Sequence, residues 1–221
     1  VSLSFLNKIY TLPNIEIQDA FLKLREQAKC YMENPAELPT ALEVINATNL
    51  NYFNNTQKAE FFTLKAIVLS RLGMIDEANR IFAQAVQIDL NISKGWSSWG
   101  YFNDQRFQQS KDITFGVNAV NCYLQAATLC KSVNSRKYLA RVLWLLTFED
   151  SIGSMSKSFE LYNHDLPSWY WVPFIPELLT SLNRREARQA RFLLMKIAKS
   201  YPQALYLQLR TVNEEYKMNT I

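Results

Sequence analysis

A histidine followed by an aspartate is the first feature of this sequence that could do chemistry. His164 is the single histidine among the 221 residues, and Asp165 stands next to it. A carboxylate can orient an imidazole for proton transfer, but a catalytic triad needs groups that meet in space, which adjacency in sequence does not provide. We therefore interpret His164 as a histidine in a surface loop.

Adjacent acidic residues are a second candidate for acid–base chemistry. The pairs Glu149-Asp150 and Glu214-Glu215 fall near the ends of expected helices. Neighbouring side chains point in different directions there, so we interpret both pairs as solvated rather than as an acid/base dyad.

Metal and phosphate sites lack their usual ligand patterns. The three cysteines, Cys30, Cys122 and Cys130, are scattered, and with one histidine they do not match a structural zinc site. We interpret them as buried thiols of a reducing compartment. The five glycines are isolated, which excludes a phosphate-cradling loop or a dinucleotide fingerprint. We predict no catalytic residue, no cofactor and no metal ligand.

Arginines offer a candidate surface for partners. Arg184, Arg188 and Arg191 are spaced by four and three residues, which would place them on one face of a helix, and Arg185 adjoins them. That face could bind an acidic protein segment or a phosphate. The alternative is a solvated outer face, because exposed arginines are ordinary on protein surfaces. Direct nucleic-acid binding would need more such stripes, so we do not expect it.

Tryptophans could form a stacking platform for bases or for a peptide. Trp96 and Trp99 are three residues apart, and Trp169 and Trp171 lie beside two prolines. In helical repeats such residues usually pack between hairpins, which is the interpretation that we prefer. The two prolines could leave Trp169 or Trp171 exposed.

The elements that must position these side chains follow a repeated helical pattern. Small and bulky residues recur with the same spacing in two segments, 41 residues apart: Ala78, Phe82 and Ala85, then Ala119, Tyr123 and Ala126. Between them, Trp96, Trp99, Gly100 and Asn103 come close to the Trp-x-x-Leu-Gly-x-x-Tyr signature of a tetratricopeptide repeat. The pattern predicts an all-α fold, an α-solenoid of degenerate tetratricopeptide-like helical hairpins. One repeat domain is expected over residues 1–221, with hairpins at about 16–48, 57–90, 93–131, 135–163 and 173–218.

Capping residues and breakers give local expectations. Thr56 and Asp76 could cap two successive helices, and Gly73 could end the first of them in a left-handed conformation. The polar stretch from Asp104 to Asp112 is expected to form an enlarged turn. A helix is expected from about Pro173 to Leu182, because proline suits the first turn of a helix.

Composition and net charge limit the class of protein to which the chain can belong. The chain is 48% hydrophobic and 20% charged, as is usual for a globular protein, and its net charge is +4. That charge is compatible with an acidic partner but is a weak argument for one. No apolar run is long enough for a membrane span, so we expect no membrane partner. The first residues include no initiator methionine and do not resemble a signal peptide, so we expect an excerpt of a longer chain.

Two segments resemble a known family. Residues 171–179, Trp-Val-Pro-Phe-Ile-Pro-Glu-Leu-Leu, and residues 201–206, Tyr-Pro-Gln-Ala-Leu-Tyr, resemble the FAT region of the phosphatidylinositol 3-kinase-related kinases. Glu177 stands where that family usually has glutamine. Residues 9–21, 94–100 and 135–146 resemble, more specifically, one pseudokinase member of the family.

The resemblance implies a function as well as a fold. The FAT region of the family is an α-solenoid that wraps the kinase-type domain, and in the pseudokinase member that domain is catalytically inactive. That member is a very large nuclear scaffold of histone acetyltransferase complexes such as SAGA, and a transcription coactivator that docks activator proteins. The expected partners are therefore other subunits of such a complex, the pseudokinase domain of the same chain and activators. No catalytic residue is carried over.

Two other functions remain open from the sequence. The chain could be the regulatory FAT segment of an active phosphatidylinositol 3-kinase-related protein kinase. It could also be a free-standing peptide-binding helical repeat module that uses its arginines.

Overall fold

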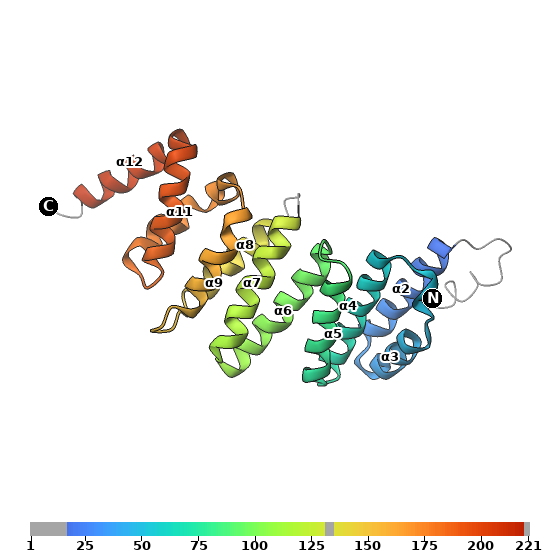
Figure 1. The fold of residues 1–221 in the computed structure, drawn as a ribbon. Coiled ribbons are helices and arrows are strands. Elements are labelled where there is room, and N and C mark those ends of the chain that lie inside the picture. The colour runs from blue at the N-terminus through green and yellow to red at the C-terminus, as the bar shows by residue number, and fades with distance from the viewer. Residues whose placement is uncertain (1–16, 131–134, 219–221) are drawn as a thin grey trace. The chain divides into compact units, whose positions relative to one another are not determined.

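The computed structural model describes residues 17–130 and 135–218, and within these ranges the regular structure is helical, without strands. The fold class is all-α, and within each unit helices that follow each other, such as α4 and α5 or α7 and α8, pack as hairpins of the α-solenoid type (Figure 1). The chain forms two compact units, Val1–Phe102 and Asn103–Ile221. Residues 16 and 131, where two of the expected hairpins begin and end, lie outside the described ranges. The division into five hairpins of one domain stays a prediction.

The first unit is built from helical hairpins. Helix α2 packs on α3, α4 packs on α5, and both α2 and α3 contact α4. A cluster of phenylalanine rings, Phe21, Phe53 and Phe61, fills the space between the first helices, with ring centroids 5.5–6.2 Å apart. The helices are α2 (Ile17–Glu33), α3 (Leu38–Ala47), α4 (Asn55–Arg71), α5 (Ile75–Ile88) and the beginning of α6 (Ser93–Ser110).

Helix α4 begins and ends for identifiable reasons. Asn54, not Thr56, is its N-cap: the Asn54 side chain accepts a hydrogen bond from the Gln57 amide, and the Gln57 side chain accepts one from the Asn54 amide. Thr56 instead donates to Asp89 at 2.8 Å. Gly73 has the expected left-handed conformation, with φ of +82°.

The expectation for Asp76 is wrong. The N-cap of α5 is Met74, which makes no side-chain cap, and Asp76 lies within the first turn. A carboxylate there still stabilises the helix, because it faces the positive end of the helix dipole.

The second unit continues the helical pattern with shorter elements. Helix α7 packs against both α8 and α9, and α11 packs against α10 and α12. Its core is one continuous apolar cluster that includes Leu139, Phe159, Trp171 and Leu193. The elements are the end of α6, α7 (Ile113–Leu129), α8 (Ser135–Leu146), α9 (Ser154–Tyr162), α10 (Ile175–Thr180), α11 (Ala187–Ser200) and α12 (Pro202–Met218), with 3-10 turns η4 (Asn163–Asp165), η5 (Ser168–Phe174) and η6 (Ser181–Asn183).

The expected turn from Asp104 to Asp112 is wrong. Helix α6 continues to Ser110, and Lys111 alone has a left-handed backbone, with φ of +58°. Asp112 then caps α7 by accepting a hydrogen bond from the Thr114 amide at 2.9 Å. The stretch stays helical because Asp104 and Phe107, although set among polar neighbours, both face the interior and are 2% exposed.

The expected helix from Pro173 to Leu182 is also wrong in its extent. Pro173 lies inside the 3-10 turn η5, and only residues 175–180 form an α-helix, with Pro176 in its first turn. A proline removes a backbone donor, so the chain uses a tighter turn before α10 begins. Trp171 is fully buried and donates to the Asn163 side chain at 3.0 Å, whereas Trp169 is 53% exposed.

Candidate functional site

The repeated small and bulky residues lie on the buried faces of their helices. Helix α5 carries one set and α7 the other, and every member is at most 4% exposed: Ala78, Phe82, Ala85, Ala119, Tyr123 and Ala126. Phe82 contacts Phe102 of α6, with ring centroids 5.4 Å apart. Alanine at these steps lets a neighbouring backbone approach, and the ring fills the remaining groove. That these positions define a repeat stays a prediction.

Trp96 and Trp99 are half-buried and contact each other. Their ring centroids are 5.9 Å apart, with planes inclined by 27°. The Trp96 indole donates to the Leu90 carbonyl at 2.9 Å, and the Trp99 indole donates to the Asn79 side chain at 2.8 Å. Both rings also pack against apolar side chains of α4 and α5, and Gly100 is buried beside them. Hydrogen bonds at both indoles hold the rings to the fold.

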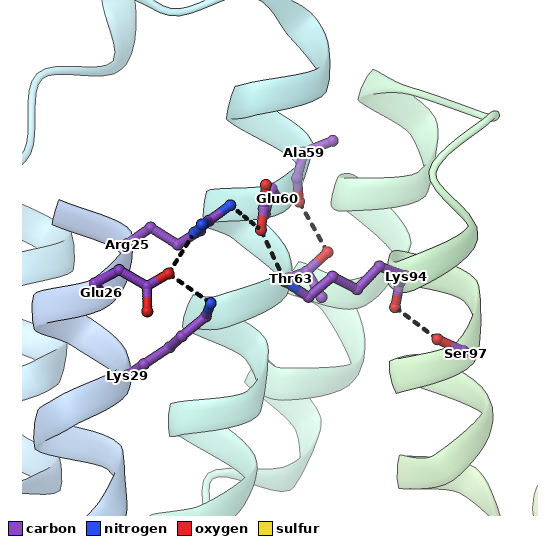
Figure 2. Close-up of polar contacts among 8 residues, drawn as sticks. All are labelled: Arg25, Glu26, Lys29, Ala59, Glu60, Thr63, Lys94 and Ser97. Atoms are coloured by element: carbon purple, nitrogen blue, oxygen red, sulfur yellow. Dashed lines mark hydrogen bonds and ion pairs between the residues drawn. The ribbon is translucent and has the colours of Figure 1, made fainter. Parts of the chain in front are cut away.

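A chain of charges crosses three helices of the first unit. Glu60 of α4 pairs with Arg25 of α2 at 3.6 Å and with Lys94 of α6 at 2.7 Å (Figure 2). Glu26 accepts from Lys29 at 2.7 Å and from Arg25 at 2.8 Å. The hydrogen bond from Lys29, more than that from Arg25, lowers the pKa of Glu26. Water screens these partly exposed pairs, so each adds little stability.

The second unit holds an ion pair on a buried carboxylate, which the sequence did not indicate. Asp104 of α6 accepts two hydrogen bonds from the Arg141 guanidinium of α8, at 2.5 and 2.9 Å. The Tyr123 hydroxyl of α7 donates to the same carboxylate at 3.2 Å. The bond to Asp104 raises the pKa of Arg141. The guanidinium also lies 3.7 Å from the centre of the Trp144 ring. One carboxylate therefore joins three helices.

We expected the acidic pair Glu149-Asp150 to be solvated, but both carboxylates also accept hydrogen bonds from backbone amides. Both carboxylates lie at the start of α9, where Glu149 accepts from the amides of Met155 and Ser156, at 3.1 and 2.6 Å. Asp150 accepts from the Ser154 amide at 2.9 Å, and this bond is the main reason why the pKa of Asp150 is lowered. The two carboxylates therefore stabilise the N-terminus of α9, because that end of a helix attracts negative charge.

The arginine candidates do not share one helix face. Arg184 lies in extended backbone after η6, and Arg185 also precedes α11, which begins at Ala187. The exposed face of α11 instead joins Arg188 and Arg191 to two apolar side chains, Phe192 and Met195, which are 43% and 56% exposed. Sequence reasoning missed these two because it followed the charges alone. Phe192 lies four residues after Arg188 and Met195 four residues after Arg191, and this spacing is the signal that could have found them.

These four side chains line an open hollow of about 760 Å³, which we call the α9–α11 hollow. Glu160 of α9 and His164 of η4 complete its lining. The Arg188 guanidinium lies 3.1 Å from the Glu160 carboxylate. His164 is exposed at this hollow. The hollow is the candidate interaction site of the second unit.

Metal and thiol chemistry receive no support from the described side chains. Across residues 17–130 and 135–218, no three or more histidine, cysteine, aspartate or glutamate side chains are grouped to hold a metal ion. Cys122 is buried, and burial raises the pKa of its thiol, whereas Cys30 and Cys130 are only half-buried. In the same part of the chain, none of the helices has the length and apolar character that crossing a membrane requires.

Comparison with known proteins assigns the chain to a family. Residues 5–144 match the FAT domain. The SAGA complex/NuA4 acetyltransferase complex subunit TRA1 of Saccharomyces cerevisiae is 55% identical over 217 residues, which are 98% of this chain and 6% of that protein. The subunit of the same name in Schizosaccharomyces pombe is 54% identical over 97% of this chain.

A human relative supports the same family assignment as the two fungal subunits. The human transformation/transcription domain-associated protein is 37% identical over 96% of this chain, which again spans 6% of the relative's length. The FAT domain match, the helical hairpins and the identities to these relatives all support one family. The chain belongs to the FAT domain family, in the group that contains Tra1 and the transformation/transcription domain-associated protein.

Proposed function

We propose that this segment is a non-catalytic scaffold within a transcription coactivator subunit of a SAGA-like histone acetyltransferase complex. The observation that carries the proposal is the 55% identity, over 98% of this chain, to a relative named as a subunit of the SAGA and NuA4 acetyltransferase complexes. The chain spans only 6% of that relative, so the proposal concerns a segment and its contribution to a larger protein. Nuclear localisation follows from the same proposal.

The proposed mechanism is mechanical. In helical repeats each hairpin is stabilised by its neighbours, so packed helices of one unit hold the surfaces of that unit in fixed positions. The Asp104–Arg141–Tyr123 network supports this role, because it ties α6, α7 and α8 together inside the second unit. The proposed partners are other subunits of the acetyltransferase complex, the pseudokinase domain of the same protein and activator proteins.

Affinity purification of the full-length protein tests the proposal. The intact protein is compared with a variant in which residues 93–131 are replaced by a neutral helical repeat. Co-purifying proteins are identified by mass spectrometry, and acetyltransferase activity is assayed on histones. We expect acetyltransferase subunits with the intact protein and their loss from the soluble variant.

Two outcomes would contradict the proposal. If the intact protein brings down no acetyltransferase subunit, the assignment to such a complex is wrong. If the variant retains every subunit and full activity, residues 93–131 make no essential contribution to assembly.

A further inference from the structure

The exposed face of α11 combines positive charge with apolar surface in one stripe. Arg188, Arg191, Phe192 and Met195 follow each other at steps of three, one and three residues, which places all four on the same side of the helix. Phe192 and Met195 are 43% and 56% exposed, although aromatic and methionine side chains favour burial. Aromatic, methionine and arginine side chains are also the types enriched at protein–protein interfaces.

The side chains of this stripe line the α9–α11 hollow, in which side chains of a partner can lie. Its volume of about 760 Å³ accommodates several side chains, and it is open rather than enclosed. A second, smaller hollow of about 250 Å³ adjoins it through Glu160 and Arg188, and Lys157 and Arg185 line this second hollow. A segment of polypeptide lying along α11 can therefore place side chains in both hollows.

The charge around the hollows identifies the chemistry of the occupant. Arg188 is paired with Glu160, but Arg191 forms no salt bridge within the part of the chain that the structure describes. The two hollows together present four basic side chains and two acidic ones, and the acidic Asp150 is already engaged by Ser154. Carboxylates complement this excess of positive charge, and guanidinium groups bind them with two parallel hydrogen bonds.

We propose that the α9–α11 hollow docks an acidic, amphipathic helical segment of another protein subunit. Apolar side chains of that segment contact Phe192 and Met195, and its carboxylates pair with Arg191 and with the free edge of Arg188. The inference rests on the proposed scaffold function, which supplies protein partners. Nucleic acid fits less well, because Glu160 lies among the basic groups and would repel phosphates, and two apolar side chains occupy the same face.

The test uses the purified full-length protein and two synthetic helical peptides. One peptide carries leucine and phenylalanine on one face and aspartate and glutamate on the other, and its partner replaces the acids by asparagine and glutamine. Fluorescence anisotropy measures the binding of each. We expect the acidic peptide to bind at least tenfold more tightly, with an advantage that shrinks as the salt concentration rises.

Matched variants locate the binding site. Arg191→Glu is expected to weaken binding of the acidic peptide about tenfold, since it replaces attraction by repulsion. Arg80→Glu, which changes another exposed arginine, on α5, by the same charge, is the control and should leave binding unchanged. The combined variant Phe192→Ala and Met195→Ala should weaken binding of both peptides, because it removes the shared apolar contact.

The proposal is overturned if the intact protein binds neither peptide, if the two peptides bind equally, or if Arg191→Glu behaves like Arg80→Glu. A duplex DNA that competes fully with the acidic peptide, and whose binding does not depend on Phe192 and Met195, would show a nucleic-acid site instead. Subunit content, measured by mass spectrometry in the same preparations, separates the two proposals. Acetyltransferase subunits without peptide binding would refute this inference alone, and peptide binding without those subunits would refute the proposed function alone.

Discussion

Replacing Arg141 by methionine is the sharpest test of how the second unit is held together. The Asp104 carboxylate is 2% exposed and accepts two hydrogen bonds from Arg141. Arg141→Met keeps much of the side-chain volume but leaves a buried negative charge without its counter-ion. Removing one partner of a buried pair costs about 3–5 kcal/mol.

The structure places the expected cost below the upper end of that range. The Arg141 side chain is 31% exposed, so water can reach part of the vacated position. Asp104 also keeps hydrogen bonds from the Tyr123 hydroxyl and from the side-chain amide of Gln108, at 3.2 and 3.0 Å. We therefore expect a loss of about 2–3 kcal/mol in the free energy of opening of α6, α7 and α8.

Hydrogen exchange followed by mass spectrometry on the full-length protein measures this local free energy. Because each 1.4 kcal/mol is a factor of ten, exchange of the protected amides in the three helices should rise roughly 30- to 140-fold. The control is Arg210→Met, which breaks the exposed pair with Glu214 on α12 at 3.0 Å. That change should alter exchange less than about threefold, because exposed pairs at this spacing contribute only a few tenths of a kcal/mol.

A double-mutant cycle identifies the cause. Asp104→Asn removes the buried charge without changing its shape, so adding it to Arg141→Met should recover about 1 kcal/mol or more of the loss. If the two substitutions simply add, the electrostatic reasoning is wrong and the cost arises from lost packing against Trp144. Exchange in Arg141→Met no faster than in Arg210→Met would refute the role of the pair altogether.

The remaining predictions concern helix capping, close packing and partial burial, and the same exchange assay measures them. Hydrogen bonds from Ser154 lower the pKa of Asp150, so its carboxylate stabilises α9 at pH values above its unfolded pKa of about 4. This stability is lost as the pH falls through the lower pKa of the folded state. Asp150→Asn should remove that pH dependence, and an unchanged pH profile would contradict the prediction. A β-carbon at Gly116 would overlap the end of the Met155 side chain, so Gly116→Ala should cost about 1–3 kcal/mol and Met155→Leu should relieve part of it. Phe82→Ala should cost about 3–5 kcal/mol because that ring is 1% exposed, whereas the half-buried Trp96→Ala should cost about 1–2 kcal/mol; equal costs would mean that burial does not set their contributions.

The fold class could be predicted because it depends on periodic patterns within short segments. The three- and four-residue steps of Ala78, Phe82 and Ala85 mark one face of a helix whatever that face later contacts. Gly73 could be predicted for a similar reason, since a left-handed residue after a helix is a local requirement. The cap at Asn54 was within reach of the same reasoning, because Asn54 and Gln57 match the capping-box spacing.

The tertiary polar contacts could not be predicted from such patterns. Asp104 and Arg141 are 37 residues apart, and their pairing depends on how α6 and α8 pack. Without that information, a buried aspartate among glutamines looks like part of a solvated turn, and the wrong turn at 104–112 follows directly. The expected place of Arg184 on one helix face with Arg188 and Arg191 is wrong for a related reason: the four-residue step from Arg184 to Arg188 implied a helix, but the helix α11 begins only at Ala187.

Three arginines of the second unit show how one side-chain type serves either structure or binding. Arg141 is held by two hydrogen bonds to a buried carboxylate and packs on an aromatic ring, so a partner could bind its guanidinium only in competition with these contacts. Arg188 has one exposed carboxylate at 3.1 Å, an interaction that water weakens and a stronger ligand could replace. Arg191 has no salt bridge within residues 17–130 and 135–218 and stands beside exposed Phe192. A charge that the fold has not already paired is free to bind a partner, and this is why the interaction surface that we propose lies on α11 rather than at the Asp104 network.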